Sequence, residues 1–144
     1  MDPAAQPVAA ARGVRILHAA LAIGLSVVAG TFVFVLRSLG PSLPNTPLIG
    51  YATAGLGLAN LAVAAGFFRP RIPPRPMDQL PDEYWVTTEA RAAAIVIWAM
   101  IEGAGLISLV GYLLTGNVVP AAVAALAIVT LIVLRPSRLE GDAI

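Results

Sequence analysis

Long apolar runs separated by short polar stretches dominate this chain of 144 residues. The runs do not alternate between apolar and polar positions, as half-buried β-strands do. Each is near the roughly 20 residues that a helix needs to cross about 30 Å of hydrocarbon. We therefore predict four membrane-spanning helices, at about residues 14–37, 48–68, 90–114 and 118–135.

The polar stretches predict how these helices connect. SLGPSLPNTP (38–47) and TGN (115–117) are short turns, so the expected arrangement is two antiparallel helical hairpins. Residues 69–89 form the one long connection, and its five prolines favour an extended, polyproline-like path. The predicted fold class is an all-α, integral membrane four-helix bundle in a single domain, residues 1–144.

The basic residues predict the orientation of the bundle. All nine are arginines, and eight of them flank the two ends of the chain or lie in and beside the long connection. Only Arg37 falls at the other side. Because positive charge collects on the cytoplasmic side, we expect both termini and the loop 69–89 to be cytoplasmic. Arginine without lysine, in an alanine-rich chain, favours a bacterial source, and hence a multi-pass protein of the inner membrane.

The two odd-numbered helices show weak similarity. Aligning Ile23-Gly24 with Glu102-Gly103 also brings Arg12 over Arg91. A tandem duplication would place the two hairpins in parallel, related by an axis along the membrane normal. Alanine-rich helices resemble one another readily, so chance similarity is the alternative.

Composition excludes several classes of function. Only 12% of the residues are charged, against about a quarter in soluble domains. A net charge of +1 gives no electrostatic footprint for nucleic acid. The absence of cysteine excludes disulfides, cysteine-ligated metals and thiol catalysis. The sequence holds no HExxH, GxSxG or phosphate-loop motif, so we do not expect an enzyme.

Glu102 is the main candidate for chemistry because it interrupts an apolar run. It follows Arg91 by eleven residues, roughly 16 Å along a helix, which places it near mid-membrane. Asn60 and Ser26 fall at similar depths, so a hydrogen-bonded polar layer of the three is expected. Glu102 has two interpretations: a proton or ion path, or a neutral carboxyl that donates a hydrogen bond to another helix.

Three further side chains suggest interfacial roles. His18 lies one turn inside the first helix, where it is either a ligand to a haem iron or chlorophyll magnesium or simply solvated. Tyr84 and Trp85 precede the third helix, where an aromatic belt anchors proteins at the membrane surface.

Glycines predict how the helices pack. Small residues allow helix backbones to approach closely, either within the bundle or against another membrane protein. We predict no cofactor or metal, although a lipid or pigment at these faces is left open. The glycines chosen for helix packing are Gly50, Gly55, Gly57, Gly103 and Gly105.

The segment IEGAGLISLVGYLLTGN resembles a group of small bacterial four-helix membrane proteins of unassigned function. The similarity extends to HAALAIGL and LIVLRPSR, about two thirds of the chain, and implies no activity. Glycine-rich helices with one mid-membrane carboxylate are also distantly similar to the hairpins of rotary-ATPase c-subunits. That family carries its carboxylate on the second helix of a hairpin, whereas Glu102 lies on the first, and the family's polar Arg-Gln-Pro loop has no counterpart here.

Together these features predict a non-catalytic accessory or structural subunit of a larger inner-membrane complex, such as a respiratory or photosynthetic assembly. The expected partners are the lipid bilayer and other integral membrane subunits, and a homo-oligomer is left open. The alternative is a proton-coupled membrane subunit that uses Glu102.

Overall fold

The computed structural model describes residues 5–141, and every regular element within them is a helix. The elements are α1 (Ala5–Leu39), α2 (Pro47–Val63), the π turn η1 (Ala64–Phe68), the 3-10 turn η2 (Arg69–Arg71), α3 (Pro81–Tyr84), α4 (Thr88–Thr115), α5 (Val118–Val133) and α6 (Pro136–Leu139). Three helical segments, Gln6–Leu39, Pro47–Arg71 and Thr88–Thr115, are long and apolar enough to span a membrane, and α5 is a shorter apolar helix. The all-α class with membrane-length helices is therefore confirmed.

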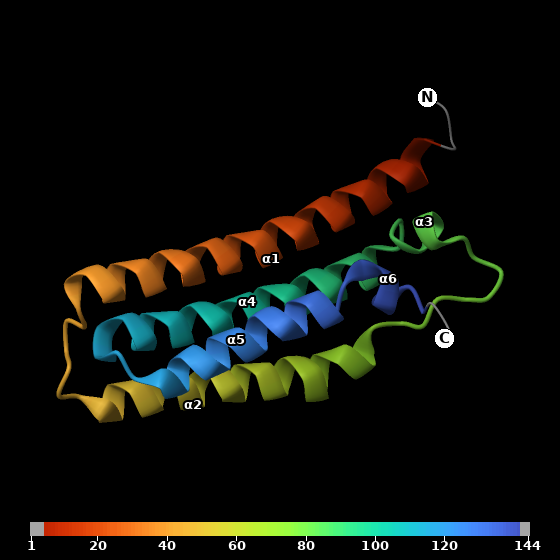
Figure 1. Cartoon of the computed structure of the whole chain (residues 1–144). Helices are drawn as coiled ribbons and strands as arrows, with labels where there is room; N and C mark the ends of the chain where they lie inside the picture. The colour runs from red at the N-terminus through yellow and green to blue at the C-terminus, as the bar shows by residue number, and fades with distance from the viewer. Residues whose placement is uncertain (1–4, 142–144) are drawn as a thin grey trace.

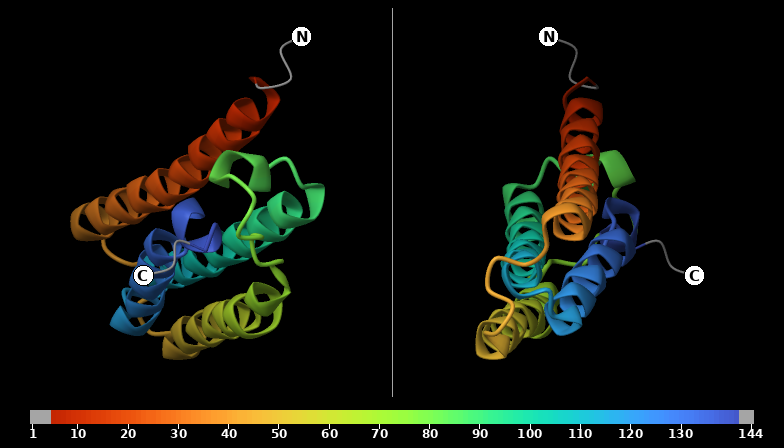
Figure 2. Two further views of the ribbon diagram at one scale, coloured as in Figure 1. Left: turned by 90° about the vertical axis from the view of Figure 1, so that its right-hand side faces the viewer. Right: turned by 60° about the vertical axis from the view of Figure 1, so that its left-hand side comes forward.

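Helix α4 lies at the centre of the bundle (Figure 1), where it contacts α1, α2 and α5. Helices α1 and α2 flank the α4–α5 hairpin on different sides (Figure 2). The expected pairing of the first two helices is thus corrected, because α1 packs against α4 and α5 rather than along α2. The connection between them runs across the end of α4 instead, where Leu43 N–H donates to Leu114 O at 2.7 Å.

The helix boundaries differ from the expected ones mainly at α1. This helix begins by Ala5 rather than near residue 14, since alanine is the strongest helix former and Pro7 is tolerated in a first turn. Helix α2 passes into η1 and η2 before the prolines of the long connection stop it. That connection also contains α3, whose Pro81 occupies the first helical position.

The turn between α4 and α5 is tight for reasons that can be read from its residues. Gly116 ends α4 with a positive φ of 68°, a conformation that glycine adopts without strain. Asn117 then caps α5, because its side-chain oxygen accepts from Val119 N–H at 2.9 Å. Both features hold α5 antiparallel to α4 (Figure 1).

Large apolar side chains face outward on all four long helices. Apolar surface that gathers on the outside of a protein marks contact with a membrane or with other proteins. Hydrocarbon would solvate it without cost. Examples, each at least 45% exposed, are Ile23, Val27, Phe34, Leu56, Val110 and Ile132.

Candidate functional site

The end of the bundle that carries the long connection holds a buried polar and aromatic cluster. It begins with the last carbonyls of α5, which have no partner within their own helix. His18 Nε2 of α1 lies 2.9 Å from Leu131 O, and Trp98 Nε1 of α4 donates to Leu134 O at 2.8 Å. Because a carbonyl only accepts, His18 Nε2 is the donor in this contact. Two neighbouring helices thus cap the end of α5.

Aromatic rings extend this cap toward α3. His18 and Trp98 pack edge to face with their ring centroids 4.9 Å apart. The ring centroids of Trp85 and Trp98 are 6.3 Å apart. Tyr84 packs against Trp85 in the same edge-to-face manner, and its hydroxyl donates to Pro73 O at 2.8 Å. All four side chains are buried. The cluster therefore fixes α3 and the long connection onto the bundle.

Glu140, just after α6, links the C-terminal segment to this cluster and to α1. Its side chain is buried, and Oε1 accepts from Trp85 Nε1 at 2.6 Å. Arg15 Nη2 of α1 approaches the same oxygen to 3.5 Å, which places a compensating charge beside it. Arg75 Nε donates to the Glu140 backbone oxygen at 2.7 Å. One residue thus connects α1, the long connection, α3 and the C-terminal segment.

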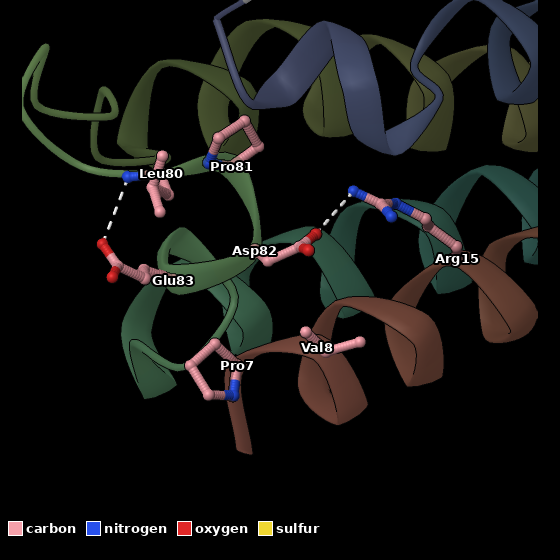
Figure 3. Close-up of a pocket in the computed structure, with 7 residues that line it drawn as sticks. All are labelled: Pro7, Val8, Arg15, Leu80, Pro81, Asp82 and Glu83. Carbon is pink, nitrogen blue, oxygen red and sulfur yellow. Dashed lines mark hydrogen bonds and ion pairs between the residues drawn. The ribbon is translucent and has the colours of Figure 1, made fainter. Parts of the chain in front are cut away.

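A cavity opens beside this cluster, between α1 and α3 (Figure 3). Its volume is 480 Å³. On its wall Arg15 Nη2 and Asp82 Oδ1 form an ion pair at 2.9 Å. Glu83 turns away from this pair, and its Oε2 accepts from Leu80 N–H at 3.2 Å to cap α3. The cavity can therefore hold a small polar group.

Burial and charge act together on one titratable group in the cluster. Burial, and then the negative charge of Glu140, raise the pKa of the Tyr84 phenol above its ordinary value of 10.0. Tyr84 is therefore a neutral hydrogen-bond donor at physiological pH.

The structure does not bring the expected polar layer together. Ser26 Oγ donates to Ala22 O of its own helix and is exposed, beside a hollow between α1 and α5. Asn60 Nδ2 donates to Met100 O of α4 at 2.9 Å. Within residues 5–141 the half-buried Glu102 carboxylate makes no hydrogen bond or ion pair. Of the three, Asn60 bridges two helices, but it does so through a backbone carbonyl rather than through Glu102 or Ser26.

His18, Tyr84 and Trp85 lie in surroundings other than those expected. His18 is buried rather than solvated, and its Nε2 contacts Leu131 O at the end of α5. No group of three His, Cys, Asp or Glu side chains within the described part of the chain could hold a metal. Tyr84 and Trp85 pack inside the protein rather than at its lipid-facing surface, because Glu140 and Pro73 O supply the partners of their polar atoms.

The five glycines predicted to pack the helices fall into two groups. A Cβ atom at Gly57 would collide with Ser108 and lie 3.0 Å from Ala104 O, and one at Gly105 would lie 2.7 Å from Leu25. Gly50 likewise faces Asn117 at 3.1 Å, whereas Gly103 has only Asn60 Nδ2 at 3.7 Å. Gly55 has nothing within 4 Å. It belongs instead to an outward small-residue stripe on α2, which comprises Ala52, Gly55, Ala59 and Ala62.

The residues that sequence reasoning missed are Arg15, Arg75, Trp98 and Glu140 as members of one site. Trp98 carried the clearest signal, because a buried indole N–H needs an acceptor. Glu140 gave none, since it lies in a short charged tail 55 residues from Trp85. Gly111, which packs against Thr53, was also missed among the packing glycines.

No family model, curated protein or solved structure matches this chain. The resemblance to small four-helix bacterial membrane proteins, and the distant one to c-subunit hairpins, therefore stay predictions.

Proposed function

We propose that this protein is a non-catalytic accessory subunit of a larger complex in a bacterial inner membrane, of the respiratory or photosynthetic kind. The observation that carries the proposal is the small-residue stripe of α2. Its four residues recur at spacings of three, four and three, so they share one face of the helix. All four are exposed, and no other helix among residues 5–141 covers Gly55.

Membrane location is supported by the lengths and surfaces of the helices. Three segments are long enough to cross the bilayer, and the apolar side chains on their outer faces suit hydrocarbon. In lipid, apolar contact alone gives helices little reason to associate. Small residues allow close backbone approach and so supply the van der Waals contact that holds membrane helices together. An uncovered stripe of this kind suits a helix of a partner subunit.

The test is co-purification of partner subunits from native membranes in mild detergent. Gly55→Leu would fill the stripe and should remove the partner subunits while the bundle stays folded. Gly24→Leu is the matched control, because Gly24 of α1 is also exposed with nothing within 4 Å. Recovery of the wild-type protein without stoichiometric partners, or equal loss in both variants, would contradict the proposal.

A second candidate is a proton-coupled subunit that uses Glu102. The observation that favours it is the free carboxylate on α4, half-buried and without a hydrogen-bond partner among residues 5–141. Intramembrane carboxylates of this kind commonly serve proton or ion paths. Glu102→Gln keeps the shape but cannot exchange a proton, so it should abolish proton flux in membrane vesicles. Unchanged flux with Glu102→Gln would exclude this candidate.

A further inference from the structure

The cavity beside the polar cluster has a lining that combines opposite charges with apolar walls. Its charged members are Arg15, Asp82 and Glu83 (Figure 3), and its apolar members are Pro7, Val8, Leu80 and Pro81. The Arg15 and Asp82 side chains are 51% and 39% exposed, so a ligand can reach both ends of their ion pair.

A second hollow, of 540 Å³, continues from the cavity along α1. The two hollows share Val8 and Arg15, and the second adds Arg12, Ile16 and Ala19. We call the two hollows together the headgroup track. It runs from the carboxylates of α3, past Arg12 and Arg15, to the apolar Ile16 and Ala19 of α1. On the proposed membrane location, Ile16 and Ala19 lie where α1 enters the hydrocarbon.

The order of groups along the track matches one class of lipid. An aminophospholipid presents an ammonium group, then a phosphate, then acyl chains. We propose that the headgroup track binds phosphatidylethanolamine, with its ammonium at Asp82, its phosphate between Arg12 and Arg15, and an acyl chain along Ile16 and Ala19. The proposal rests on the membrane location proposed above.

The chemistry of the track favours this headgroup over the two common alternatives. A primary ammonium donates charge-assisted hydrogen bonds to a carboxylate, whereas the quaternary ammonium of phosphatidylcholine has no N–H to donate. The uncharged glycerol of phosphatidylglycerol leaves the Asp82 charge uncompensated once the phosphate has drawn Arg15 away. The carboxylate end of the track therefore sets the preference, and the arginines bind the phosphate that all three lipids share.

Native mass spectrometry of the delipidated full chain, with the three lipids carrying identical acyl chains, tests the proposal. An exposed charge pair predicts a preference for phosphatidylethanolamine over phosphatidylcholine of about three- to fivefold. Asp82→Asn should bring this ratio to about one, and Asp82→Glu should restore it. Arg12→Gln should weaken binding of all three lipids and leave the ratio unchanged.

Two surface variants provide matched controls. Asp78 is an exposed carboxylate of the same connection, and Arg138 is an exposed arginine at the same end of the bundle, and neither lines the track. Asp78→Asn and Arg138→Gln should therefore bind like the wild type. Equal binding of the three lipids, or an Asp78→Asn effect as large as that of Asp82→Asn, would overturn the proposal.

Extraction of native membranes with alkaline carbonate separates this outcome from failure of the proposed function. Release of the protein into the soluble fraction would contradict membrane insertion and the lipid site together. Retention in the membrane with no lipid preference would contradict the lipid site alone.

Discussion

Glu140 joins the C-terminal segment to α1 and to two points of the long connection. Removing its side chain leaves the buried Trp85 N–H without an acceptor. We expect Glu140→Ala to lower the free energy of unfolding by about 1–3 kcal/mol, the usual cost of an unsatisfied buried donor. Arg15 adds little to this figure, because its side chain is half exposed and its charge is screened. Titration with SDS in mixed micelles, followed by circular dichroism, measures the change.

Glu140→Gln separates hydrogen bonding from charge at the same position. The amide oxygen still accepts from Trp85, so its loss of stability should be smaller than that of Glu140→Ala. Asp78→Ala removes an exposed carboxylate of the long connection and should change stability by no more than about 0.5 kcal/mol. Equal losses in Glu140→Ala and Asp78→Ala would show that the buried contacts contribute nothing.

Tyr84 predicts how stability depends on alkaline pH. Its pKa is raised in the folded protein, first by burial and then by Glu140, so the folded state keeps the proton after the unfolded state has lost it. The resulting stabilisation is complete below pH 10 and is lost as pH rises through the raised pKa. We therefore expect the free energy of unfolding to fall above pH 10, and to fall less steeply in Tyr84→Phe. Identical slopes in the two proteins would contradict this account.

At the scale of helices, α2 and α4 pack closely because glycine, whose side chain is a single hydrogen atom, lies between them. A methyl group at Gly57 would press on Ser108 Oγ and lie 3.0 Å from the Ala104 carbonyl, which belongs to the helix backbone and cannot turn aside. We expect Gly57→Ala to cost about 1–3 kcal/mol of unfolding free energy through overpacking. The same micelle titration measures it. Gly55→Ala, two residues away, is the control and should be close to neutral, because a Cβ atom at Gly55 has nothing within 4 Å. An equal cost in the two variants would contradict the role of Gly57 in packing.

The sequence predicted where the helices lie along the chain much better than it predicted which helices and side chains pack together. Hydrophobic length located α2, α4 and α5, and Gly116 with Asn117 marked the turn between α4 and α5. Depth along a helix placed Glu102, Asn60 and Ser26 at one level, but it gives no angle about the helix axis. Ser26 accordingly points to its own Ala22 carbonyl. The rotation of a helix about its axis depends on which of its small residues pack against the next helix. It therefore depends on the sequences of both helices together.

The polar cluster could not be predicted for a related reason. Its contacts join residues far apart in the sequence, such as His18 with Leu131 O and Trp85 with Glu140. No periodic pattern connects them. The signal that existed was local, since Arg135-Pro136 ends α5 and leaves carbonyls in need of donors. Buried His and Trp side chains are the donors that such an end can recruit.

At the scale of the whole molecule, the length of α1 sets a limit on how the protein can lie in a bilayer. Its 35 residues extend about 52 Å, well beyond the roughly 30 Å of hydrocarbon. The excess lies at the end that α3, α6 and the long connection share (Figure 1). Arg15 of α1 pairs with Asp82 of α3 at this end, and Arg12 lines the same hollow as Arg15. An aqueous position for this end keeps the arginines and carboxylates hydrated, and from the positive-inside rule we expect this end to face the cytoplasm.

The lack of cysteine makes this orientation directly measurable, because each engineered thiol reports from one site only. Asn45 lies exposed in the turn between α1 and α2, and Asp78 lies exposed in the long connection. In intact spheroplasts we expect a membrane-impermeant maleimide to label Asn45→Cys and to leave Asp78→Cys unlabelled until the membrane is permeabilised. The reverse pattern would invert the topology and place the headgroup track in the outer leaflet. Labelling of both sites before permeabilisation would mean that the apolar faces do not span the membrane, and that their exposure must be covered by protein instead.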